Sequence, residues 1–127
     1  MIVLRILGYI WAAPLTLVGL LLYAILGGWR GMRWRDGVLE AIPKRIPGMA
    51  NTVAQTWGWS IWYLDEKWRA LPSLRRHERV HVRQAMILGP FFAALYVGNF
   101  LINLAIYRNA QKAYEEIWFE RMARRAE

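Results

Sequence analysis

Apolar residues gather in two long uncharged stretches. Ile6 to Gly28 contains no charged side chain, and neither does Ala85 to Tyr107. At about 1.5 Å per residue, the first stretch would reach roughly 34 Å as a helix, enough to cross the hydrocarbon core of a bilayer. A cleaved signal peptide fits less well, because Arg5 alone forms the charged start and no small-x-small site follows. The first stretch therefore predicts a transmembrane helix.

The segment between the two stretches has a mixed pattern. Asp36-Gly37 indicates a turn, and Val38 to Ile42 favours a short strand. Thr52 to Leu64 is rich in Thr, Val, Trp, Ile and Tyr, which favours a second strand paired with the first. The alternative for Thr52 to Leu64 is an interfacial amphipathic helix with a Trp face.

Helical patterning resumes at Pro72. Ser73 is the expected N-cap, and a helix is predicted from Leu74 onward. The tail over residues 108–127 alternates charged and apolar residues, which predicts a terminal amphipathic helix. The sequence thus predicts a mostly α, membrane-embedded fold with a small β-hairpin. We expect an anchor over residues 1–28 and a minimal membrane-associated domain over residues 29–127.

Composition supports a membrane protein. Hydrophobic residues make up 57% of the 127 residues, against about 45–50% in soluble domains. Eight tryptophans agree with this, because Trp collects at membrane interfaces. The absence of cysteine excludes disulfides and thiolate chemistry. The net charge of +8 arises from basic residues beside the apolar stretches, so we expect lipid rather than nucleic acid as the partner.

The arginines that follow the first apolar stretch predict its orientation. Arg30, Arg33 and Arg35 come directly after it. By the positive-inside rule, the N-terminus lies outside the cell and residues 30–84 lie in the cytoplasm.

The chain's two histidines form a single motif, His77-Glu78-x-x-His81. On a helix, positions i and i+4 share a face, so both imidazoles can bind one Zn²⁺. Glu78 would reach the metal-bound water and act as general base. A carboxylate must supply the third ligand, and the tail offers Glu115, Glu116 and Glu120 for this role.

The motif and its surroundings resemble a family of small, poorly characterised bacterial membrane proteins. These have a zinc-peptidase-like signature similar to that of the gluzincins. The resemblance rests on residues 76–84, on 11–19, on Leu88-Gly89-Pro90 and on Phe119-Glu120-Arg121-Met122-Ala123. It implies that Glu120 is the third ligand and that the protein lies in the bacterial inner membrane. Ile117-Trp118 stands where the family has Asn-Pro, so Glu116 remains the alternative ligand.

Glu120 can meet His77 only if the second apolar stretch turns back. A straight transmembrane helix over residues 85–107 would place the two residues on opposite sides of the membrane. Gly89-Pro90 and Gly98-Asn99 interrupt the stretch, and Asn99 and Asn103 would be costly against lipid. We therefore expect a re-entrant hairpin broken at Gly98-Asn99. A spanning helix with a decoy motif is the alternative.

Two functions fit these features. The first is a membrane-anchored zinc hydrolase of the metallopeptidase type that acts on peptides. The second is a non-catalytic accessory subunit of a larger membrane complex, in which the motif is structural or vestigial.

Several other residues have a functional and a structural interpretation. Gln84 is a candidate partner of a ligand histidine. Tyr107 and Tyr114 could stabilise an oxyanion, but their spacing selects neither for the site. Arg75, Arg76, Arg79 and Arg83 would contact lipid phosphates or an acidic substrate, and Trp57, Trp59 and Trp62 would form an interfacial belt or a cleft wall.

Overall fold

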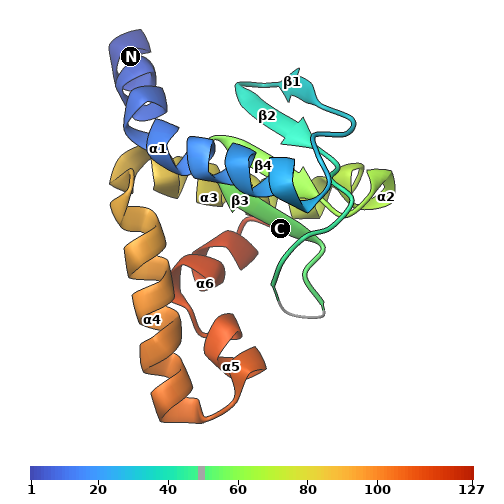
Figure 1. The fold of residues 1–127 in the computed structure, drawn as a ribbon. Helices are drawn as coiled ribbons and strands as arrows, with labels where there is room; N and C mark the ends of the chain where they lie inside the picture. The colour runs from blue at the N-terminus through green and yellow to red at the C-terminus, as the bar shows by residue number, and fades with distance from the viewer. Residues whose placement is uncertain (49–50) are drawn as a thin grey trace.

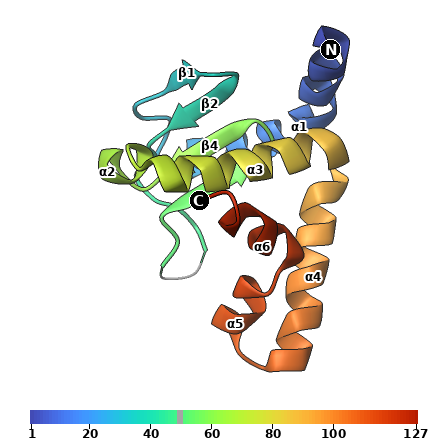
Figure 2. The same ribbon diagram turned by 180° about the vertical axis from the view of Figure 1, so that it is seen from behind.

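The fold is mostly helical, as predicted, but it contains a four-stranded mixed sheet where a short β-hairpin was expected. It was determined as a computed structural model, and it describes residues 1–48 and 51–127. The elements are α1 (Ile2–Leu26), β1 (Arg33–Arg35), β2 (Val38–Ala41), β3 (Ala54–Trp57), β4 (Ser60–Tyr63), α2 (Glu66–Arg69), α3 (Pro72–Leu88), α4 (Phe91–Tyr107), α5 (Ala110–Glu115) and α6 (Trp118–Arg124). Figure 1 shows α1 on one side of the sheet, and Figure 2 shows α3 on the other.

Among the described residues, α1 is the one helix that is by itself long and apolar enough to cross a membrane. It bends along its length (Figure 1), and Pro14 lies inside it. A proline within a helix removes one backbone hydrogen bond and favours such a bend. The part of α1 before the bend projects from the body and exposes apolar side chains such as Ile2, Leu7 and Ile10. Ala12 and Leu15 pack into the core, so the predicted anchor also contributes to the domain.

The sheet consists of two hairpins joined by a parallel pairing, in the order β1-β2-β4-β3. Asp36 and Gly37 both have positive φ angles and form the two-residue turn between β1 and β2, as their sequence favours. The single strand predicted over Thr52–Leu64 is wrong. Gly58, at φ 60°, begins a turn that divides this segment into β3 and β4, and β3 forms one edge of the sheet.

α3 begins two residues earlier than predicted. Leu71, rather than Ser73, is the N-cap, and Pro72 occupies the first helical position. Proline is favoured there because its missing N–H would have no helical partner. The helix then continues through the H-E-x-x-H motif as expected.

The second apolar stretch turns at its first interruption. α3 and α4 meet at 116° across Gly89-Pro90, whereas α4 continues through Gly98-Asn99 without a break. The hairpin break predicted at Gly98-Asn99 is therefore wrong. Gly89 adopts φ 57°, and a Cβ there would lie 2.4 Å from the Trp11 ring. Only glycine fits both the backbone angle and the close contact with α1.

The C-terminal segment forms two short helices instead of the single helix predicted. α5 and α6 are separated at Glu116-Ile117, where the Ile117 side chain is fully buried. The two asparagines of α4 hold this segment. Asn103 Nδ2 donates to the carbonyl of Ala113 at 3.0 Å, and Asn99 Oδ1 accepts from the N–H of Trp118 at 2.9 Å. The polar groups that suggested a helix break instead attach α5 and α6 to α4 (Figures 1 and 2).

Candidate metal centre

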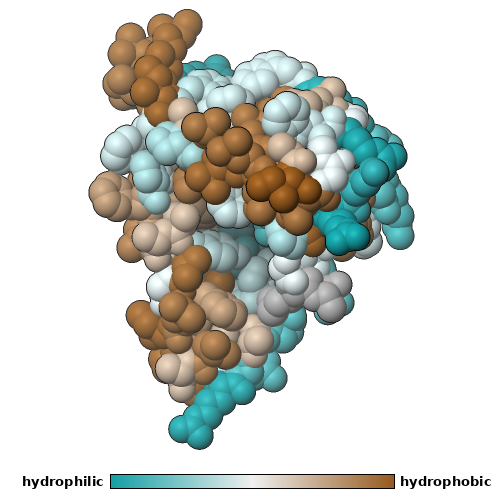
Figure 3. Space-filling view, viewed as in Figure 1, coloured by the Kyte–Doolittle hydropathy of each residue, from teal (hydrophilic) through white to brown (hydrophobic). Residues whose placement is uncertain are grey.

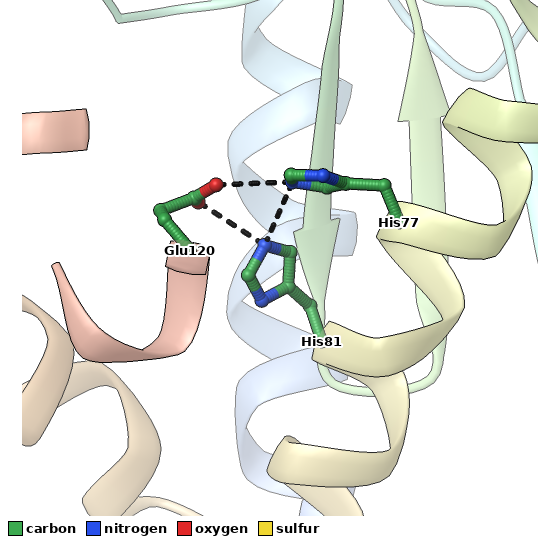
Figure 4. A group of neighbouring side chains, drawn as sticks. All are labelled: His77, His81 and Glu120. Carbon is green, nitrogen blue, oxygen red and sulfur yellow. Dashed lines mark hydrogen bonds and ion pairs between the residues drawn. The ribbon is translucent and has the colours of Figure 1, made fainter. Parts of the chain in front are cut away.

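The two histidines of the motif point from one face of α3 to the same place (Figure 4). Their Nε2 atoms lie 3.3 Å apart, and both side chains are buried. The spacing i to i+4 brings them together because a helix turns once in about 3.6 residues.

Glu120 reaches the histidines from the first turn of α6. Its Oε2 lies 3.0 Å from His77 Nε2, and its Oε1 lies 3.1 Å from His81 Nε2. The side chain is only 3% exposed. The structure thus brings the three predicted ligands into one buried group, which could hold a metal ion.

The spacing of the donor atoms suits a small tetrahedral ion. Ligands about 2.0–2.1 Å from a tetrahedral zinc lie roughly 3.3 Å from one another. The two Nε2 atoms are 3.3 Å apart, and each lies 3.0–3.1 Å from a different oxygen of Glu120, which is close to that value. Two imidazoles and one carboxylate also form a donor set that zinc accepts in catalytic sites.

Each histidine is oriented through its other ring nitrogen. His81 Nδ1 lies 2.8 Å from Gln84 Oε1, and His77 Nδ1 lies 2.7 Å from Glu127 Oε1. Both oxygens accept, so the hydrogen bonds favour a proton on Nδ1 and leave Nε2 free to ligate. The expected contact of Gln84 is confirmed. Glu127 was not singled out, because no sequence pattern links it to a histidine fifty residues away.

The pKa values of the three residues reflect strong mutual attraction. Burial alone would lower the pKa of His81, but the hydrogen bond and charge of Glu120, with the charge of Glu78, raise it to about 9. The same opposing causes leave the pKa of His77 raised. Burial would raise the pKa of Glu120, but hydrogen bonds from both histidines hold it well below its usual range. Without a metal, shared protons hold this cluster together, and a metal would displace them.

Glu78 lies beside the cluster without belonging to it. Its Oε2 accepts a 2.6 Å hydrogen bond from the hydroxyl of Thr56 on β3. Burial raises the pKa of the Glu78 carboxyl, while the charges of His81 and His77 and the Thr56 bond oppose that rise. A carboxylate with a raised pKa is suited to accept a proton near neutral pH. Thr56 was missed because one threonine in a strand carries no signal for such a role.

Glu120 has a further partner on α4. The hydroxyl of Tyr96 donates to Glu120 Oε1 at 2.6 Å. Tyr96 therefore helps to fix the carboxylate and links α4 to α6. It is another residue that the sequence did not indicate.

Two cavities meet at this group. A polar one of about 560 Å³ is lined by His77, Glu78, Glu120 and several further carboxylates. An apolar one of about 340 Å³ is lined by Glu78, His81, Glu120 and a set of aromatic side chains. Glu78 and Glu120 line both, so the site is reached from two sides.

The other residues that the sequence suggested for the site lie outside the trio of ligands. Glu116, the alternative ligand, lies outside the trio. Its Oε2 is 3.9 Å from Nη1 of Arg121, and the residue lines the polar cavity together with Glu115. Tyr114 lines both cavities, whereas Tyr107 is exposed. Trp57 lines the apolar cavity, but Trp59 and Trp62 pack in the core, so the predicted belt or wall of three tryptophans is wrong.

Three of the four motif arginines join elements of the fold. Arg79 donates to the carbonyls of Arg35 and Asp36, Arg75 to that of Arg69, and Arg76 to that of Ala126. These contacts hold the first hairpin and the C-terminal residues against α3. Arg83 is exposed.

Comparisons with protein-family models, curated proteins and solved structures find no match to this chain. The function is therefore argued from the site itself.

Proposed function

We propose that the chain is a membrane-anchored, zinc-dependent hydrolase with a metallopeptidase-type site, of the gluzincin-like kind that its motif resembles. The observation that carries the proposal is the position of Glu78. This buried carboxylate stands beside a group of three ligand-type residues and lines both cavities that lead to them. A purely structural metal site has no need of a free carboxylate at the meeting point of two cavities.

His77, His81 and Glu120 would hold the zinc, which when bound supplies an activated water and polarises the substrate carbonyl. Glu78 takes the proton from the attacking water. The water oxygen bonds to the carbonyl carbon, and the C–N bond breaks. Glu78 passes its proton to the leaving nitrogen, so that the products are a carboxylic acid and an amine. Thr56 holds the Glu78 carboxylate in place through the 2.6 Å hydrogen bond.

The proposed setting is the cytoplasmic side of a bacterial inner membrane. α1 serves as the anchor, and the three arginines after it remain in the cytoplasm. The domain packs directly on α1, so the site would work close to the bilayer surface.

The test compares two substitutions in the purified full chain. Glu78→Gln keeps the shape of the side chain and removes the base, so it should retain zinc and lose almost all peptide hydrolysis. His77→Ala leaves two ligands and should lose the metal itself. Glu66→Gln is the matched control, because the Glu66 side chain is exposed and pairs with Arg69 rather than with the trio, and it should change neither property. Unchanged hydrolysis in Glu78→Gln would rule out the proposed base.

The accessory-subunit function has one observation in its favour. α4 exposes a row of apolar side chains, namely Phe91, Leu95, Leu101, Ile102 and Ile106. Figure 3 shows brown surface along α4 as well as at the start of α1. Such a surface fits partner helices as well as lipid. Co-purification of a stable complex that forms equally well with Glu78→Gln would favour this function over hydrolysis.

A further inference from the structure

The two cavities at the site are chemically opposite. They share the residues Thr52, Ala54, Glu78, Tyr114 and Glu120, so they adjoin along a common boundary. A ligand that reaches Glu78 can therefore extend into both. Figure 3 shows a recess between α4 and the body above it, where the surface is hollowed.

The apolar cavity lies mainly between β3 and α4, with one contribution from α1. Its walls include Leu15 of α1, Trp57 of β3, and Phe92, Tyr96, Val97 and Phe100 of α4. Its volume of about 340 Å³ lies within the range of roughly 300–1,000 Å³ that is typical of ligand pockets. Val97 is 53% exposed, which places it where the cavity meets the surface. This half of the site suits a bulky apolar group.

The polar cavity has the opposite character. Five carboxylates line it against one guanidinium, that of Arg124, and the acids are Glu78, Glu115, Glu116, Glu120 and Glu127. Glu120 belongs to the candidate centre, Glu78 lies beside it and Glu127 orients His77, whereas Glu115 and Glu116 face the cavity outside the centre. Such a lining attracts cationic groups and repels anionic ones.

A polypeptide fits both halves better than a lipid does. β3 is one of the two edge strands of the sheet. Residues 52–54 line the polar cavity, and residues 54–57 line the apolar cavity. An edge strand offers backbone donors and acceptors that an extended peptide can pair with. The acidic lining also disfavours the anionic headgroups of bacterial lipids.

From this juxtaposition we infer the substrate class of the site. The protein cleaves polypeptides where a basic stretch meets a bulky apolar side chain, with the apolar side chain in the cavity between β3 and α4 and the basic residues in the carboxylate-lined cavity. This inference rests on the proposed hydrolase function. Sequences of this kind flank the cytoplasmic ends of transmembrane segments, which the anchored site would meet at the membrane surface.

The experiment uses the full chain in detergent micelles with added zinc. Four synthetic peptides of equal length carry Lys-Lys-Phe-Phe, Lys-Lys-Ser-Ser, Glu-Glu-Phe-Phe or Glu-Glu-Ser-Ser at their centre. Cleavage is followed by mass spectrometry, and binding to the Glu78→Gln variant is measured by fluorescence anisotropy. The first peptide should be cleaved, and bound, at least about tenfold better than any other, because an apolar pocket discriminates by about this much. Raised ionic strength should reduce the advantage of lysine over glutamate.

Val97→Trp fills the mouth of the apolar cavity from an exposed position. It should remove the preference for phenylalanine while the metal content stays unchanged. Leu101→Trp is the matched control, because Leu101 lies on the same helix, is 56% exposed and does not line either cavity. Glu115→Lys adds a positive charge to the polar cavity and should reduce the preference for peptides with lysine.

Each outcome decides between the two proposals. Selective binding of the first peptide without cleavage would support the ligand class and overturn the hydrolase function. Cleavage of all four peptides at equal rates would support the hydrolase and overturn the ligand class. A fluorescent fatty acid that binds the wild type and is excluded by Val97→Trp, with peptide binding unchanged, would overturn the polypeptide in favour of an acyl chain. If no peptide is bound or cleaved, both proposals are wrong.

Discussion

The hydroxyl of Thr56 lies 2.6 Å from Oε2 of Glu78 and joins the edge strand of the sheet to the proposed base. Thr56→Val keeps the shape of the side chain and removes this donor. A hydrogen bond to a charged group contributes about 1.5–3 kcal/mol, so hydrolysis should fall by roughly 10- to 100-fold. The zinc content should not change, because Thr56 touches no ligand of the trio. Thr56→Ser should restore most of the rate, and an equal loss in both variants would contradict the assigned role.

Gln84 orients His81 from within α3. Gln84→Leu removes the acceptor that holds His81 Nδ1 at 2.8 Å. Loss of such an outer partner weakens metal binding by about 10- to 100-fold, which a competition assay with a chelating dye would measure. Arg83→Ala is the neighbouring control, since Arg83 is exposed and should leave the zinc Kd unchanged. Equal affinity in wild type and Gln84→Leu would mean that the helix alone fixes the imidazole.

These contacts show where sequence reasoning succeeds and where it stops. His77 and His81 are four residues apart on one helix, so local geometry alone brings them together. The choice between Glu116 and Glu120 depends on a helix break that no local pattern marks. In one continuous helix these two residues would share a face, but the interruption at Glu116-Ile117 turns Glu116 away from the trio. The resemblance to the zinc-peptidase-like family indicated Glu120, whereas spacing could not.

The path of the second apolar stretch was predictable only in part. The sequence indicated that residues 85–107 must turn back, because Glu120 has to meet His77. It did not indicate which glycine makes the turn. That depends on Trp11 of α1, whose ring lies against Gly89 and is seventy-eight positions away in the sequence. The asparagines of α4, which were expected to be costly against lipid, pair with the backbone of the C-terminal segment.

Gly89 and Gly98 should therefore respond in opposite ways to the same substitution. Gly89→Ala places a Cβ 2.4 Å from the Trp11 ring at φ 57°. A residue forced into this backbone region costs about 1–3 kcal/mol before any clash is relieved, so the melting temperature in micelles should fall. Gly98→Ala meets no atom within 4 Å on a regular helix and should stabilise by about 0.5–1 kcal/mol. A larger loss in Gly98→Ala would instead support a break at that position.

The orientation of α1 can be tested cleanly because the chain contains no cysteine. A cysteine introduced at Arg33 should react with a membrane-impermeant maleimide only after the inner membrane is opened. A cysteine at Ile2 should react in intact spheroplasts. These outcomes follow from the basic residues after α1, which the positive-inside rule would retain in the cytoplasm. Labelling of position 33 from outside would reverse the proposed topology and place the site on the other face.

The candidate centre joins α3 to α6, and this gives metal binding a consequence for stability. His77 and Glu120 are forty-three positions apart in the sequence, and their side chains meet only in the folded chain. A ligand that binds only the folded state stabilises it by about 2.7 kcal/mol at a free concentration of about 100 times Kd. Added zinc should therefore raise the melting temperature of the full chain in micelles, and a chelator should reverse the shift. His81→Ala should remove the response, while Glu78→Gln should retain it in full, because Glu78 acts on the water rather than as a ligand. A zinc-dependent shift that survives His81→Ala would place the metal elsewhere. A shift lost in Glu78→Gln would make Glu78 a ligand and leave the proposed hydrolase without its base.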